Sequence, residues 1–246
     1  MTITAASLRA LLRAHADPAN AAGAQRYFTD GVKTYGVRRE KLDAFAREAA
    51  VSLKARGGAQ AALRIAGGLY RSGNMDEAAL AARILQRFHR DLGSEHWNTF
   101  NRWIDFLQDW ASCDSLCTQI IGPVVRGHPA LVRRVVPWTR SQHRWRRRAA
   151  AVCLIPLART GEHVDDVLDI ADRLLGDPDE MIQKGVGWLL KEASREQARE
   201  VIAYLVENRE RTARLVLRYA SEKLTPAQRL SVLGRPGRPR EVRAAR

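Results

Sequence analysis

The chain has 246 residues, 46% of them hydrophobic and 28% charged, which is typical of a soluble globular protein with a sizeable core. Its net charge of +14 is not typical, and it favours nucleic acid or an anionic membrane surface over neutral partners. No apolar run approaches the roughly 18 residues of a membrane span, and the N-terminal segment lacks a signal peptide's apolar stretch. We therefore expect a cytoplasmic protein.

Almost every segment repeats its apolar residues with helical period, and none alternates them in the manner of a strand. Short breaks rich in Gly, Pro, Asn or Asp separate the segments. In chain order, the predicted helices are 3–16, 19–29, 39–55, 59–72, 75–90, 95–107, 110–126, 129–138, 143–159, 162–175, 178–194, 198–207, 209–222 and 226–233. Pairs of these helices recur at intervals of roughly 35–40 residues, which is within the range of HEAT-type repeats.

This organisation predicts an all-α protein, an α–α superhelix built as a HEAT-like repeat solenoid, although a right-angled αα bundle would give a similar pattern. We expect one repeat domain over residues 1–233, with a concave basic groove suited to a long partner. The last stretch, 234–246, is rich in Gly, Pro and Arg and cannot bury apolar surface. It is expected to be a disordered basic tail.

A tryptophan and a carboxylate stand at the start of the predicted helix 110–126. Trp110 and Asp114 are four residues apart, so one helical turn places both at the same rim of an apolar stripe. We expect Asp109 to cap this helix and Pro123 to kink or end it. Taken alone, Asp114 can also be explained as a carboxylate favoured by the positive end of the helix.

A purely cationic run follows this helix start. Between Ser115 and Gly161 there are nine arginines and no acidic residue. In the predicted helix 143–159, Arg148 lies beside the apolar face, so its stem can be buried while its guanidinium reaches outward to a phosphate. Pro156 should bend or end this helix. The other arginines of this block are interpreted as solvated charge that raises general DNA affinity: Arg144, Arg146 and Arg147.

The predicted helix 178–194 carries a large side chain away from its apolar stripe. Trp188 falls roughly 140° from the centre of the stripe, on the side of Lys184 and Lys191. This position suits packing against a sugar–phosphate backbone while the two ammonium groups meet phosphates. Packing of Trp188 on a neighbouring helix is an equally good interpretation.

Other reaction types have little support in the sequence. The six histidines are scattered, and none stands at metal-ligand spacing from Cys, Asp or Glu. P-loop, GxGxxG and GxSxG motifs are absent. The three cysteines are too few for a disulfide framework. We therefore expect neither a metal nor a cofactor.

Several short stretches together resemble one family over roughly residues 20–222. They are RYF followed by YGVR (Arg26–Phe28 and Tyr35–Arg38), WASCDS (Trp110–Ser115), HPALV (His128–Val132), RWRRRAA (Arg144–Ala150) and IQKGVGWLLKE (Ile182–Glu192). In these stretches the chain resembles the AlkD family, HEAT-like DNA glycosylases that remove alkylated bases. The last stretch and the Trp-x-x-x-Asp pair are the most specific of the matches.

The resemblance implies roles for individual residues. Asp114 matches the family's catalytic aspartate, and Trp110 matches the tryptophan beside it. Trp188 matches a second tryptophan that contacts the deoxyribose of the lesion. Arg148 matches an arginine at the DNA backbone, and Tyr27 an aromatic residue close to it.

Further DNA contacts are expected from Lys184, Lys191 and Arg38. After the YGV-like segment the family has a polar loop that contains proline, whereas this chain departs to Arg38-Arg39-Glu40. The residues that would contact the base opposite the lesion therefore differ in this chain from those of the family.

The resemblance also implies a mechanism. Purines alkylated at N3 or N7 carry a positive charge, so the base leaves without a general acid. An ionised Asp114 can stabilise the oxocarbenium-like sugar and position a water, while Trp110 and Trp188 hold the sugar with their faces. The family acts without flipping the base into a pocket, contrary to the usual glycosylase strategy. We expect a monomeric, monofunctional alkylpurine glycosylase that acts on double-stranded DNA in base excision repair. We expect it to have no membrane partner and to associate with the bacterial nucleoid through DNA.

Two other function classes remain open. A non-catalytic binder of branched or distorted DNA would bind with steep salt dependence and release no base. A protein-interaction scaffold is the commonest use of a HEAT solenoid, but the arginine run without acidic residues disfavours it.

Overall fold

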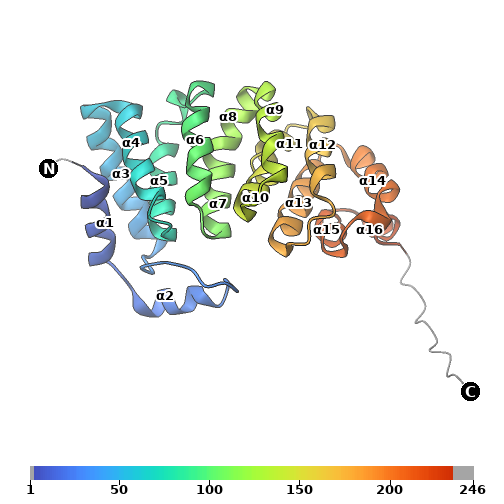
Figure 1. Cartoon of the computed structure of the whole chain (residues 1–246), viewed down its shortest axis with the longest axis horizontal. Coiled ribbons are helices and arrows are strands. Elements are labelled where there is room, and N and C mark those ends of the chain that lie inside the picture. Colours follow the sequence, from blue (N-terminus) through green and yellow to red (C-terminus); the bar gives the residue numbers. More distant parts are fainter. Residues whose placement is uncertain (1–2, 235–246) are drawn as a thin grey trace, which may run out of the picture. The chain divides into compact units, whose positions relative to one another are not determined.

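A computed structural model describes residues 3–234, and every regular element in that range is a helix (Figure 1). The chain divides between Leu157 and Ala158 into two compact units. The predicted single domain over residues 1–233 stays a prediction. Apart from Gly234, the predicted basic tail lies outside the described residues.

The first unit consists of helices joined by short turns, close to the predicted ranges. Its α-helices are α1 (Ala5–Ala14), α2 (Pro18–Gln25), α3 (Arg39–Arg56), α4 (Gly58–Tyr70), α5 (Met75–Gln86), α6 (Trp97–Trp103), α7 (Trp110–Leu116), α8 (Gly122–Gly127), α9 (Val132–Val135) and α10 (Arg144–Val152). Short 3-10 segments flank some of these helices: His89–Asp91, Ser94–His96, Ile104–Phe106, Pro129–Leu131 and Val136–Arg140. A π-helical turn, Cys117–Ile121, connects α7 to α8.

The second unit continues the same pattern. Helix α11 (Ile155–Ala158) stands at the division between the units. The α-helices that follow are α12 (Val164–Leu174), α13 (Glu180–Ala193), α14 (Ala198–Glu207), α15 (Arg214–Ala220) and α16 (Pro226–Leu233), with a 3-10 segment at Arg209–Arg211.

The core of the first unit forms around α5. This helix packs against α3, α4 and α7, and α7 packs in turn against α10 (Figure 1). Five apolar side chains on the packed faces of α5 and α7 are fully buried: Leu80, Ile84, Leu85, Cys113 and Leu116. Because burying a Leu or Ile side chain contributes about 1.5–3 kcal/mol, these faces fix α7 firmly between its neighbours.

Local sequence signals explain the ends of the two helices that matter most. Asp109 caps α7, as predicted, and its side chain accepts a hydrogen bond from the Ser112 amide. Helix α10 ends at Val152, and α11 begins just before Pro156, so the predicted interruption is confirmed. Pro123 lies in the first turn of α8, directly after the π-helical turn, where its missing N–H is tolerated.

In the second unit α13 packs closely against α15 and also contacts α12. A Cβ atom at Gly187 would lie 2.4 Å from Cβ of Tyr219 on α15, so only glycine permits this approach. Close helix packing therefore accounts for the second glycine of IQKGVGWLLKE.

Candidate functional site

The start of α7 positions a tryptophan and a carboxylate one turn apart. The Asp109 carboxylate accepts bonds from the Ser112 amide and hydroxyl, both at 2.7 Å, and the residue is 2% exposed. Burial raises the pKa of Asp109, while its bonds from Ser112 act in the opposite direction. This buried cap fixes Trp110 in the first turn and Asp114 in the second.

The Asp114 carboxylate is held by Arg148 of α10. The guanidinium donates from Nε to Oδ1 and from Nη2 to Oδ2, each at 2.8 Å. Arg148 is only 6% exposed, so the prediction that its guanidinium reaches outward is wrong. Burial lowers the pKa of Arg148, but the negative charge of Asp114 and their hydrogen bonds raise it overall. A buried guanidinium is not solvated by water, so it pairs with a carboxylate that lies within reach.

This pair fixes the carboxylate without closing it off. Two parallel donors occupy about one lone pair on each oxygen of a carboxylate that offers about four. The Asp114 side chain retains 17% of its exposure, so another molecule can reach it. The Thr118 hydroxyl donates to the Asp114 carbonyl at 2.7 Å within the π-helical turn, a structure often found at functional sites.

Trp110 is covered on one side by the segment after α2. Its indole stacks on Phe28 with ring centroids 4.9 Å apart and planes 13° from parallel. Its Nε1 donates to the Tyr27 carbonyl at 3.3 Å, and the Tyr27 side chain is 76% exposed. The structure therefore places the Tyr27 backbone next to Trp110 and adds Phe28 as the residue in ring contact.

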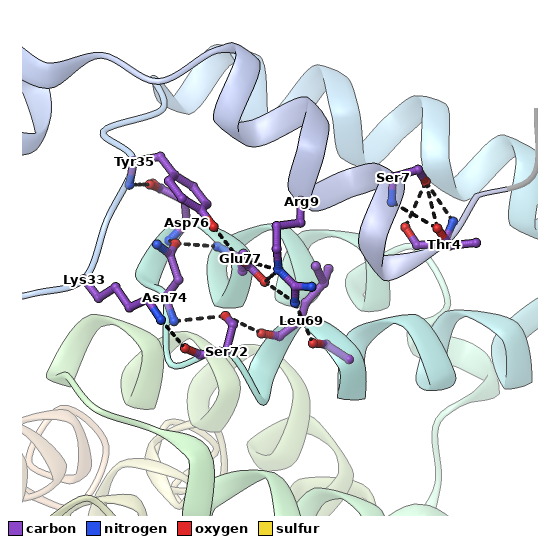
Figure 2. Close-up of polar contacts among 11 residues, drawn as sticks. Thr4, Ser7, Arg9, Lys33, Tyr35, Leu69, Ser72, Asn74, Asp76 and Glu77 are labelled. Carbon is purple, nitrogen blue, oxygen red and sulfur yellow. Dashed lines mark hydrogen bonds and ion pairs between the residues drawn. The ribbon is translucent and has the colours of Figure 1, made fainter.

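The segment that carries Tyr27 and Phe28 is anchored further along at the start of α5 (Figure 2). The Asp76 carboxylate accepts bonds from the Tyr35 amide at 2.6 Å, the Thr34 hydroxyl at 2.7 Å and the Gly36 amide at 3.0 Å. The Glu77 carboxylate accepts from the Tyr35 hydroxyl at 2.7 Å and also pairs with Arg9.

The glycine of YGVR, Gly36, has a backbone conformation and a close contact that favour glycine. Its φ of +76° is in the left-handed region, and an added Cβ would lie 2.3 Å from the Asp17 carbonyl oxygen. At the other end of the segment Asp30 pairs with Arg144 at 2.5 Å. Arg144, predicted to be a solvated charge, thus contributes to docking this segment on α10.

A hollow of about 820 Å³ lies beside α7. Residues of α2, of the start of α3, of α5, of α7 and of the π-helical turn line this hollow. They include Asp17, Asn20, Arg38, Arg39, Ala79, Arg83, Ala111, Ser115 and Gln119. Arg38 is 73% exposed at the rim, where it pairs with Asp17 at 3.2 Å. Of the expected DNA contacts in this unit, Arg38 is the charged one that remains accessible.

The second unit holds Trp188 on α13, as predicted, outside a fully buried apolar stripe. The Trp188 Nε1 donates to Glu192 Oε1 at 3.3 Å. Glu192 also accepts from Arg159 at 2.9 Å and pairs with Arg195 at 3.3 Å. Burial raises the pKa of Glu192, but the bonds and charges of these partners lower it overall. Glu192 was not among the predicted site residues, although its four-residue spacing from Trp188 places the two side chains on one helical face.

The two lysines beside Trp188 have carboxylate partners. Lys184 lies 3.6 Å from Glu180, and Lys191 donates to Glu222 at 2.9 Å with 17% of its side chain exposed. The first unit therefore gathers Tyr27, Trp110, Asp114 and Arg148, and the second gathers Trp188 and both lysines. One site composed of both groups stays a prediction, as do the roles in DNA binding.

The three cysteines, Cys113, Cys117 and Cys153, are free thiols that are fully buried. Burial raises the pKa of all three thiols. Among residues 3–234 no group of three or more His, Cys, Asp or Glu side chains is arranged to hold a metal ion. None of the helices described is long and apolar enough to cross a membrane.

Comparison with known proteins agrees with the motifs. A sequence model of the DNA alkylation repair enzyme family matches residues 8–224. A solved structure of a predicted DNA alkylation repair enzyme from Enterococcus faecalis shares the fold, with a TM-score of 0.75 and 16% identity over 86% of this chain and 98% of its own. No curated protein matches the sequence. The predicted fold class is confirmed, whereas its basic concave groove stays a prediction. Since the family model spans most of the chain, this protein belongs to the DNA alkylation repair enzyme family.

Proposed function

We propose that the protein is a monofunctional DNA glycosylase that acts as a monomer on double-stranded DNA. It hydrolyses the N-glycosidic bond of cationic N3- or N7-alkylated purines. One observation carries the proposal: the Asp114 carboxylate is fixed by two bonds from Arg148, remains accessible, and stands one turn from the indole of Trp110. Membership in an alkylation repair family supports DNA as the partner.

The chemistry needs a fixed negative charge and little else. An alkylated purine is already positive, so the C1′–N9 bond breaks with the electron pair moving to the base, which leaves neutral. The developing cation on the sugar is stabilised by the Asp114 carboxylate. A water held by a remaining lone pair adds to C1′, and its proton passes to the carboxylate and then to solvent. The products are the free base, an abasic sugar and one proton.

Trp110 fits the role of a sugar platform. Phe28 stacks on one face of the indole and fixes the ring, and we assign the opposite face to the ligand. A positive oxocarbenium sugar over an indole face is attracted by about 0.5–2 kcal/mol. We assign the same role to Trp188, which Glu192 holds by its Nε1.

Direct transfer of the alkyl group to a cysteine is the main chemical alternative for alkylation repair. That reaction needs an exposed thiolate. All three thiols of this chain are buried with raised pKa values, which argues against them as acceptors.

The proposal is tested by base release from duplex DNA. The chain should release 7-methylguanine and 3-methyladenine, and it should leave neutral lesions such as uracil and hypoxanthine in place, because no general acid is assigned to the site. Extending the panel to bulky cationic adducts defines the range of substrates. Tight, salt-dependent binding without release of any base would contradict the proposal and favour a non-catalytic binder of distorted DNA.

A further inference from the structure

Helices α3 and α5 run side by side between two hollows. Both helices begin at the hollow beside α7, which is lined by Arg39 of α3 and Met75 of α5. A second hollow, of about 500 Å³, is lined by the later residues of α3, by the last residue of α5 and by the residues after it: Arg47, Ala50, Val51, Lys54, Gln86, Arg87 and His89. The two helices therefore point in the same direction, away from the start of α7.

One face of each helix connects the two hollows. On α3, Asp43, Arg47 and Lys54 are spaced by four and seven residues, which places them on the same face. On α5, Arg83 and Arg87 are likewise one turn apart, with Arg87 at the C-cap. Asp43 and Arg83 pair across the two helices at 2.7 Å, about one turn along α3 from Arg39. We call the surface from Arg39 to Lys54 the α3–α5 furrow.

The far part of the furrow is positively charged. Arg47, Lys54 and Arg87 are exposed, and of the described residues that line this hollow none is acidic. Elsewhere in this unit several arginines face a carboxylate, as Arg9, Arg146 and Arg148 do. Cations at the C-terminal ends of helices are favoured by the helix dipole, which accounts for Lys54 and Arg87. It does not account for Arg47, which lies in the middle of α3.

We propose that the α3–α5 furrow binds the phosphate backbone of the duplex on one side of the lesion, with Arg47, Lys54 and Arg87 as the contacts. The inference rests on the proposed function, because it takes DNA as the occupant. From Arg39, Arg47 lies about 12 Å and Lys54 about 22 Å along the helix axis. At about 3.4 Å per base pair, the phosphates that these residues bind lie about four to seven base-pair steps from the phosphates near the first hollow.

Salt dependence of binding measures these contacts. Each phosphate neutralised adds about 0.9 to the slope of log affinity against log salt, so a triple variant Arg47→Ala, Lys54→Ala, Arg87→Ala should lose about 2.7 of the wild-type slope. Between 50 and 200 mM salt its affinity should fall about 40-fold less than that of the wild type. The matched control replaces three other exposed arginines of the first unit, Arg56, Arg64 and Arg102, and should keep the wild-type slope.

Position along the DNA is tested with single methylphosphonate substitutions, which remove one charge at a time. Substitutions about four to seven steps to one side of a 7-methylguanine should weaken binding of the wild type but not of the triple variant. At saturating protein, weaker binding no longer limits the reaction, so single-turnover base release by the triple variant should stay within twofold of wild type. The single variant Arg47→Ala keeps the helix and should show one third of the effect.

The outcomes separate this inference from the proposed function. Base release by the wild type together with an unchanged slope in the triple variant overturns the furrow alone. An altered slope without base release by the wild type overturns glycosylase activity and supports the furrow as a DNA surface. Loss of binding to phosphatidylserine vesicles with an unchanged DNA slope overturns the inference in favour of a membrane surface.

Discussion

Arg148→Met removes the guanidinium that holds Asp114 and keeps an unbranched stem in a position only 6% exposed. Removing one partner of a buried ion pair costs about 3–5 kcal/mol, because the other charge stays behind without compensation. The Asp114 side chain retains 17% exposure and can be partly rehydrated, so we expect a loss of about 2–3 kcal/mol. For a chain of this size that lowers the Tm by about 4–12 °C.

A double-mutant cycle with Asp114→Asn isolates the pair. In the Asp114→Asn background, Arg148→Met leaves no buried charge without a partner. The free energy change of the double variant should therefore differ from the sum of the two single changes by about 1–3 kcal/mol. Denaturant unfolding followed by circular dichroism measures all four proteins. Single-turnover base release by Arg148→Met should fall about 100-fold, since a carboxylate that is no longer held loses its alignment.

The result that refutes this reasoning is additive stability changes together with a salt slope lowered by about 0.9. Arg148 would then contact a phosphate, as the sequence alone suggested, and its bond to Asp114 would have no energetic weight. The exposed pair Arg173 and Asp169, which bonds in the same two-point manner, is the control and should show no measurable coupling.

Three further predictions concern other parts of the molecule. The pKa of Glu192 in the folded protein lies below its ordinary value of 4.5. The ionised Glu192 therefore stabilises the fold above pH 4.5, and this stabilisation is lost as the pH falls through the pKa of the folded protein. Glu192→Gln should make the decline of Tm between about pH 5 and about pH 3 less steep. Gly36→Ala should cost more than about 1–2 kcal/mol in denaturant unfolding, because it adds a clash to a positive φ, whereas Gly31→Ala at nearly the same φ has room for its Cβ. The three buried thiols should react with a disulfide reagent only after unfolding, and rapid labelling of the native protein would contradict their burial.

Much of the fold could be predicted because its signals are local. Helical periodicity, the cap at Asp109 and the break at Pro156 each depend on a few neighbouring residues, and the structure agrees with all three. The π-helical turn after Asp114 could not be predicted, since its extra residue per turn depends on how α7 packs against α5 and α10. The anchoring of the Tyr35 segment on Asp76 is equally non-local, because the two residues are 41 positions apart.

The candidate site shows the same limit. Trp110 and Asp114 lie one turn apart on α7, as their spacing predicted, but helical position alone gave the Arg148 side chain the wrong direction. A guanidinium beside an apolar face can point to solvent or to a carboxylate of another helix, and Asp114 is 34 residues away in sequence. The bond between Trp188 and Glu192 is local by contrast, because one helical turn separates the two residues, and it could have been predicted from their spacing.

The most direct test of the central claim is single-turnover release of 7-methylguanine by Asp114→Asn at saturating protein. The account predicts a fall of about 100-fold or more, the scale expected when one group that stabilises developing charge is removed. Binding of the same duplex should be retained, because the loss of a negative charge should not weaken contacts with phosphates. The control Asp105→Asn alters an exposed carboxylate that also pairs with an arginine and should leave the rate unchanged. Base release by Asp114→Asn at the wild-type rate would contradict the assignment of this carboxylate to the reaction.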